Sequence, residues 1–160
     1  MKKNEHILKS IINECKKHAL RMNSAFEKIH QDLPIKPDEV FKLSNDQVEH
    51  IDQFIFRFSK LQDSIGQKLF KAVLEELGED VSNKSFIDIF NRLEQLEIIR
   101  DYEVWKELKN LRNDIAHEYE EDEHEAAEKL NLLFEKKKLQ EKYLNDILAY
   151  LMNQPLPDSI

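Results

Sequence analysis

Arg112, Asn113 and Asp114 precede His117 and Tyr119 in the stretch Arg-Asn-Asp-Ile-Ala-His-Glu-Tyr, which holds the side chains best suited to chemistry in this chain. Arginine stays cationic and can hold a phosphate with a fork of donors, while histidine titrates near neutral pH and can transfer a proton. Asn113 can position a phosphate or a ribose, and Asp114 can orient His117 or pair with Arg112. The stretch therefore predicts a site that handles phosphate.

Helix geometry limits what this stretch can do within one chain. Arg112 and His117 are offset by about 140° on a regular α-helix, because each residue turns by about 100°. One helix can aim both at a small target only if it ends near His117, or if a second copy supplies the missing group. Alternatively, these polar residues cap carbonyls and form surface pairs at a helix C-terminus. From the spacing alone, that purely structural interpretation is favoured.

The spacing of apolar residues predicts an all-α protein of about five helices. Steps of three and four residues recur along the chain, and only two glycines and four prolines are available to break them. The expected helices cover about residues 4–30, 46–77, 85–96, 101–118 and 123–152. We expect one domain over residues 1–152 and a frayed tail over residues 153–160.

The long second helix carries two candidate supporting residues, Arg57 and Asp63. An equally simple interpretation is that they form a partly exposed ion pair with each other. Gly66 costs about 1 kcal/mol relative to alanine inside a helix, so we expect another backbone to approach closely there. Phe56 and Phe70 lie off the apolar stripe, which predicts a helix that is central or lines a dimer interface.

The fourth helix is expected to deliver Arg112 and His117 at its last turn. Trp105 is in register with the leucines of that helix, which predicts that it lies in the core.

In the last helix, residues 136–138 are three consecutive lysines and form the one dense basic run of the chain. We expect this run to form an exposed helix face.

Composition excludes several classes of function. A formal net charge of −8 argues against a general, electrostatically driven nucleic-acid binder, so a nuclease would need a locally positive cleft. Cys15 is the only cysteine and is expected to be a small buried hydrophobe, which leaves no disulfide framework. We expect a soluble, cytoplasmic protein without a signal peptide or a membrane partner, because no apolar run is long enough. Glycine-rich phosphate loops and nucleophile elbows are absent.

An acidic run over residues 118–125 follows the motif. Its carboxylates suit the start of the last helix, repel RNA and would attract a basic partner. If the run held a divalent ion, His117 and His124 would be candidate ligands. The spacing matches no metal motif, so we expect neither a metal nor a cofactor.

Arg112, His117 and Tyr119 form the pattern R-x-x-x-x-H-x-Y, which resembles the signature of the HEPN ribonucleases and in particular of the HepT-like toxins. Those toxins are paired with a minimal nucleotidyltransferase antitoxin. The resemblance extends from about Asp46 to the C-terminal helix and includes Trp105 before the motif. It implies a HEPN-like helical bundle that forms a two-fold dimer, with both Arg–His pairs at one cleft. It also implies metal-independent endoribonuclease activity that leaves a cyclic phosphate.

In this resemblance the RNA's own 2′-hydroxyl attacks the adjacent phosphorus, while His117 transfers protons and Arg112 stabilises charge on the phosphate. One histidine cannot be acid and base at once, so a dimer would supply the second. The antitoxin would silence the site by adding AMP to Tyr119, which adds bulk and negative charge. The expected partners are a second copy, the nucleotidyltransferase and RNA, but not DNA. The alternative is a non-catalytic partner subunit that docks a nucleotidyltransferase through Tyr119 and the acidic run.

Overall fold

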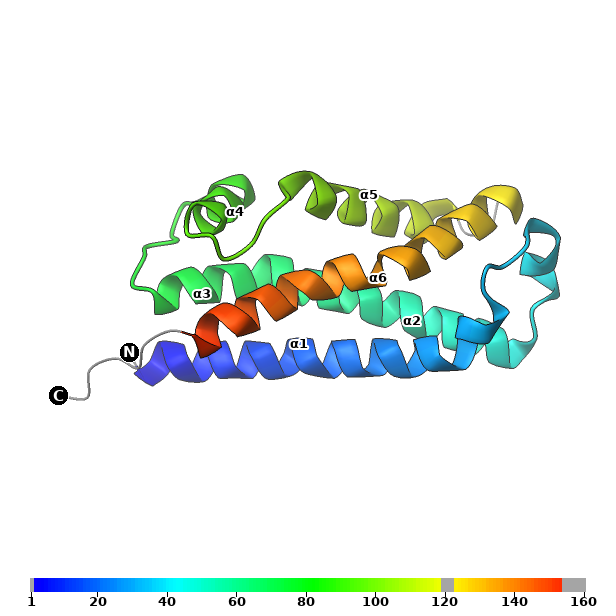
Figure 1. The fold of residues 1–160 in the computed structure, drawn as a ribbon, viewed down its shortest axis with the longest axis horizontal. Helices are drawn as coiled ribbons and strands as arrows, with labels where there is room; N and C mark the ends of the chain where they lie inside the picture. The colour runs from blue at the N-terminus through cyan, green and yellow to red at the C-terminus, as the bar shows by residue number, and fades with distance from the viewer. Residues whose placement is uncertain (1, 119–122, 154–160) are drawn as a thin grey trace.

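The computed structural model describes residues 2–118 and 123–153, and at positions 2, 116–118 and 123 it describes the backbone only. This part of the chain is helical and contains no strand, which confirms the predicted all-α class (Figure 1). The helices are α1 (Lys2–Ile29), α2 (Asn45–Asp63), α3 (Phe70–Glu76), α4 (Phe86–Gln95), α5 (Tyr102–Glu118) and α6 (Glu123–Met152). Short 3-10 helices η1 (His30–Asp32) and η2 (Pro37–Lys42) connect α1 to α2.

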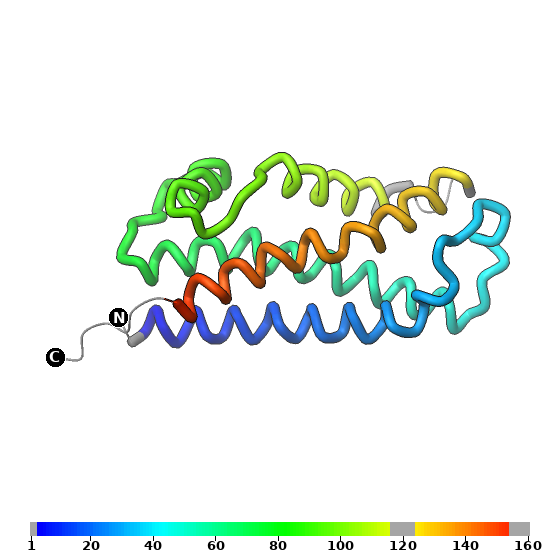
Figure 2. Tube along the Cα trace, in the orientation of Figure 1, coloured from blue at the N-terminus to red at the C-terminus, as the bar shows by residue number. Residues whose placement is uncertain are grey.

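A π-helical segment, η3 (Ser64–Leu69), joins α2 to α3 without a break. The helix expected over residues 46–77 is therefore one continuous rod, and five rods make up the bundle. Figure 2 shows α1 running antiparallel to this rod, and α6 crossing the bundle obliquely. In the same view α5 runs antiparallel to α2. None of the helices in the described ranges is both long enough and apolar enough to cross a membrane.

The core lies where the apolar stripes of all five rods meet. Each large apolar side chain that is fully buried in this core contributes about 1.5–3 kcal/mol to the free energy of folding, relative to the same side chain exposed to solvent. Trp105 is 3% exposed and Cys15 is completely buried, as predicted for both. Burial raises the pKa of the Cys15 thiol to about 12, so it stays protonated. The largest fully buried side chains are Phe54, Phe58, Phe70, Phe90, Met22, Ile51, Leu61, Ile65, Leu69, Leu93, Ile99 and Leu108.

Local sequence signals mark where helices begin and end, at positions close to the predicted boundaries. Ser44 caps the start of α2 with a capping box. Its hydroxyl oxygen accepts a hydrogen bond from the backbone N–H of Gln47, and the side-chain oxygen of Gln47 accepts one from the backbone N–H of Ser44. Ser85 and Asp88 form the same arrangement at the start of α4. Gly78 follows α3 with φ of +84°, a left-handed conformation that glycine adopts without strain.

The expectation of a close backbone approach at Gly66 is wrong, because the neighbour is a side chain. A Cβ built on Gly66 would lie 2.8 Å from Cζ2 of Trp105. The indole of α5 therefore packs directly on the π-helical segment η3. This contact sets how closely the start of α5 approaches the rod that carries Asp63.

Lys137 corrects the prediction of an exposed basic face over residues 136–138. Its ammonium donates to Oδ1 of Asn23 at 2.6 Å and to Glu141 at 3.2 Å, and it lies 4.9 Å from the ring centroid of Phe26. The residue is buried, whereas Lys138 is exposed. Lys137 thus belongs to the interface between α1 and α6.

Candidate functional site

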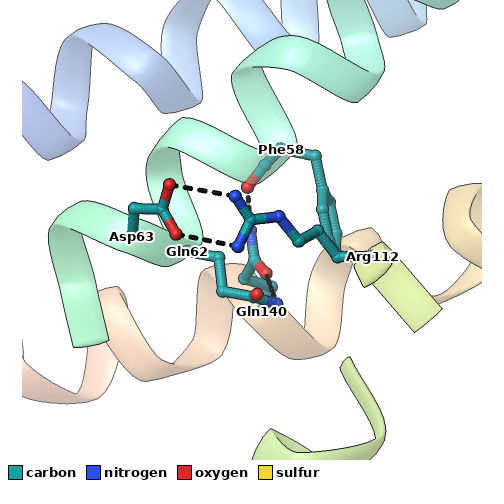
Figure 3. A network of polar contacts seen from close by, with 5 residues as sticks. All are labelled: Phe58, Gln62, Asp63, Arg112 and Gln140. Atoms are coloured by element: carbon teal, nitrogen blue, oxygen red, sulfur yellow. Dashed lines mark hydrogen bonds and ion pairs between the residues drawn. The ribbon is translucent and has the colours of Figure 1, made fainter. Parts of the chain in front are cut away.

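Arg112 reaches from α5 to the end of α2, where it meets Asp63 (Figure 3). Its Nη1 and Nη2 atoms donate to the two carboxylate oxygens at 3.0 and 3.1 Å. This is the bidentate geometry that a planar guanidinium and a carboxylate favour. The two side chains are 28% and 29% exposed, so the pair remains open to solvent. Asp63 uses two of the five N–H groups of Arg112, which leaves three for other acceptors.

Two buried amides lie beside this pair and join α2 to α6. Gln62 donates to Oε1 of Gln140 at 3.1 Å, and Gln140 donates to the carbonyl of Phe58 at 2.9 Å (Figure 3). Gln62 is 3% exposed and Gln140 is completely buried. Buried amides keep their place only where their hydrogen bonds are satisfied. This network therefore helps to hold the part of α2 from which Asp63 projects.

Neither glutamine was predicted as a site residue, although the sequence contains one signal for Gln140. Lys137 and Gln140 occupy the same apolar register of α6 as Leu133, Leu144 and Ile147, in steps of three and four. A polar residue at a core position of an amphipathic helix is expected to be buried and hydrogen-bonded.

Arg112 lies six residues before the end of α5, and not in its last turn as predicted. The helix continues regularly past this position because its apolar stripe extends to Ile115, which is buried. His117 lies in the last turn, one residue before Glu118. The helical backbone therefore keeps the offset of about 140° between Arg112 and His117. Tyr119 lies outside the described residues, as do the acidic residues 120–122.

The pairing of Asp114 with Arg112, one of the two roles predicted for this carboxylate, does not occur. The Asp114 carboxylate lies 3.8 Å from Nζ of Lys129 on α6, because Arg112 turns towards α2 instead. Asn113 is exposed on the surface of α5. The structure thus brings Arg112 together with Asp63, and it leaves Asn113 and Asp114 outside that contact.

Arg57 does not pair with Asp63 either. Its Nη1 atom donates to Nδ1 of His18 on α1 at 3.0 Å, so the imidazole must accept with an unprotonated nitrogen. Burial lowers the pKa of His18, and the nearby charge of Arg57 lowers it further. His18 was not predicted as a site residue, because the contact joins positions 39 residues apart in the sequence.

Within the described ranges, no group of three or more histidine, cysteine, aspartate or glutamate side chains has the arrangement of a metal site. Comparisons with protein-family models, with curated protein sequences and with solved structures gave no match to this chain.

Proposed function

We propose that this protein is a metal-independent endoribonuclease toxin of the HEPN type, which cleaves RNA at a composite cleft of a homodimer. A nucleotidyltransferase antitoxin would neutralise it by adenylylating Tyr119. One observation carries the proposal beyond the sequence motif. The guanidinium of Arg112 is held in place by Asp63, remains partly exposed and lies five residues before His117 on one helix.

Asp63 acts in this proposal as the residue that orients Arg112. The end-on fork of the guanidinium is bound to the carboxylate, while Nε and one N–H on each Nη atom remain for non-bridging phosphate oxygens. A cation fixed before substrate binds stabilises developing charge with little reorganisation. Arg112 would therefore stabilise the phosphorane-like transition state.

His117 would carry out the proton transfers. The 2′-hydroxyl gives its proton to a general base, and its oxygen forms a bond to the adjacent phosphorus. The bond from phosphorus to the 5′-oxygen then breaks, and a general acid protonates that oxygen. The products are a 2′,3′-cyclic phosphate and a free 5′-hydroxyl, and no metal or external water is consumed.

A second copy of the chain would complete this machinery. One imidazole cannot be base and acid in the same step, and the offset of about 140° separates Arg112 from His117 on one helix. A two-fold axis would place the Arg112 and His117 of one protomer opposite those of its partner. The cleft would then contain two histidines and two arginines.

The test is cleavage of an end-labelled structured RNA by purified protein in EDTA. We expect His117→Ala and Arg112→Ala each to lower the rate by at least about 100-fold, as removal of one proton-transfer or charge-stabilising group does. Arg112→Lys should also be impaired, because it keeps the charge but loses the planar fork. His6→Ala and Arg100→Ala change exposed residues elsewhere and serve as matched controls. Equal cleavage by all five variants would refute the proposal.

One observation favours a second candidate, the non-catalytic partner subunit of a nucleotidyltransferase. Arg112 is bound at both Nη atoms by Asp63, and in this candidate the pair joins α5 to α2 without binding a ligand. This candidate predicts a stable complex with the nucleotidyltransferase and no RNA cleavage by folded protein that carries no AMP. Charge reversal of Glu120, Glu121 and Glu123 should then weaken that complex.

A further inference from the structure

Phe56 is an exposed aromatic residue of α2, and two cations, Arg57 and Lys60, follow it within one helical turn. Its side chain is 48% exposed, although it belongs to a helix whose other phenylalanines are fully buried. The Cζ atom of Arg57 lies 5.3 Å from the ring centroid, and Nζ of Lys60 lies 5.7 Å from it. We propose that Phe56, Arg57 and Lys60 form a base-stacking site for single-stranded RNA. The inference rests on the proposed ribonuclease function.

The position of Phe56 fits a substrate that also reaches Arg112. Phe56 lies seven residues before Asp63, so the two share one side of α2 and are separated by about 10 Å along its axis. His117 lies about 7.5 Å beyond Arg112 along α5. Because α2 and α5 run antiparallel, both steps lead in the same direction along the bundle (Figure 1). The ring is therefore level with the end of α5 that carries the rest of the motif.

The charges around Phe56 suit an anionic ligand. Arg57 is fixed by its hydrogen bond to His18, and the charges of Lys17 and Lys60 also act on that imidazole. Cations therefore gather here on a chain whose net charge is −8. Glu14 of α1, whose charge also acts on His18, is paired with Lys68 at 3.0 Å. On α2 itself Asp52 and Asp63 lie on either side of the cluster, and Asp63 is neutralised by Arg112.

The exposed ring together with two cations favours RNA, and not a second copy of the chain, as the ligand of this surface. In a two-fold contact centred on Phe56, the same surface would meet itself, and Arg57 and Lys60 would face their own equivalents. A single nucleic-acid strand complements both features of the surface. Its bases can stack on the ring, and its phosphates can be neutralised by the two cations.

The experiment measures binding without cleavage. A fluorescein-labelled 2′-O-methyl oligouridine lacks the attacking hydroxyl, and an abasic oligonucleotide of equal length carries only the backbone charge. We expect Phe56→Ala to weaken binding of the oligouridine by about tenfold, as the loss of one stacked base does, and to change abasic binding less than twofold. Phe56→Trp should retain the affinity. Phe41→Ala is the matched control, since Phe41 on η2 is 57% exposed.

Lys60→Ala tests the electrostatic part of the site. It should weaken both oligonucleotides and reduce the salt dependence of binding by about one counterion. The inference is overturned if the wild type binds neither oligonucleotide, or if Phe56→Ala binds oligouridine as the wild type does. It is also overturned if Phe56→Ala changes the sedimentation coefficient while leaving RNA binding unchanged, because Phe56 would then lie between copies.

The outcome is separable from that of the proposed function, because the probe cannot be cleaved. A protein that binds oligouridine through Phe56 but cuts no RNA would refute the ribonuclease alone. A protein that cuts RNA through His117 but binds equally well without the Phe56 ring would refute the stacking site alone.

Discussion

Lys137 and Arg112 are both cations that contact a carboxylate, yet their surroundings differ. Lys137 is enclosed between α1 and α6, where Asn23, Glu141 and the ring of Phe26 surround its ammonium. Its side chain is 9% exposed, whereas that of Arg112 is 28% exposed. Among the residues that the structure describes, Arg112 meets the carboxylate of Asp63 alone, and this contact uses two of its five N–H groups.

The difference separates a structural charge from one that can act on a ligand. The protein satisfies a buried ammonium completely, because an unpaired charge in the interior is very costly. A partly exposed guanidinium with spare donors carries a much smaller penalty and can exchange water for a phosphate. Enclosure therefore identifies Lys137 as part of the scaffold, and partial exposure identifies Arg112 as a candidate for binding.

The largest effect on stability is expected from Lys137→Met. The substitution leaves Glu141 without its buried cation, and we expect it to lower the free energy of unfolding by about 3 kcal/mol. Urea denaturation measures the change, with the exposed neighbour Lys138→Met as a control that should stay within about 0.5 kcal/mol. Adding Glu141→Gln to the first variant should recover part of the loss. Equal stabilities of the two lysine variants would contradict the role of Lys137 as an enclosed structural charge.

Gly66→Ala tests the contact that sets the spacing of α5 and the rod of α2. Alanine usually stabilises a helix by about 1 kcal/mol, but here its Cβ would lie 2.8 Å from the buried ring of Trp105. Overpacking of this kind costs about 1–3 kcal/mol, so we expect a lower melting temperature. Adding Trp105→Phe should relieve part of the strain. A higher melting temperature in the single variant would contradict the close contact.

Asp63→Asn should separate binding from stability at Arg112. We expect it to lower the free energy of unfolding by less than about 1 kcal/mol, because the pair is partly exposed. RNA cleavage should fall by about tenfold, since the guanidinium loses one of its two restraints. Asp146→Asn breaks another partly exposed pair, with Lys142, and should leave cleavage unchanged. A loss of stability as large as that of Lys137→Met would place Arg112 in the scaffold as well.

The smallest expected effect on stability concerns a third cation, Arg57, whose hydrogen bond to His18 requires that imidazole to be neutral. Burial and the charge of Arg57 lower the pKa of His18 below its ordinary value of 6.5. The unfolded chain therefore binds more protons than the folded protein between these two pKa values. This contribution to stability is present above pH 6.5 and is lost as the pH falls towards the folded pKa.

His18→Gln should remove that dependence, because glutamine can accept from Arg57 and does not titrate. Urea denaturation of the wild type and of His18→Gln at pH 7.5 and at pH 5.5 measures how the free energy of unfolding depends on pH in each protein. The variant should lose less stability on acidification than the wild type. Parallel losses would show that His18 does not accept from Arg57 as a neutral group.

The local features of the fold could be predicted from the sequence because they depend on neighbours in the chain. Steps of three and four residues predicted the rods, and Ser44, Gly78 and Ser85 marked their ends. The register of Trp105 with the leucines of α5 predicted its burial. These signals come from side chains within one or two helical turns of each other.

The sequence by itself determined the helices, their ends and the spacing of Arg112 and His117 along one of them. Only the tertiary structure decided that Arg112 pairs with Asp63, 49 residues away, that Arg57 turns to His18 and that Lys137 is enclosed. Helical periodicity reports which residues share a face, and this is a local property. The partner of a polar side chain depends on the distance and angle between two rods, which the packing of the whole core sets.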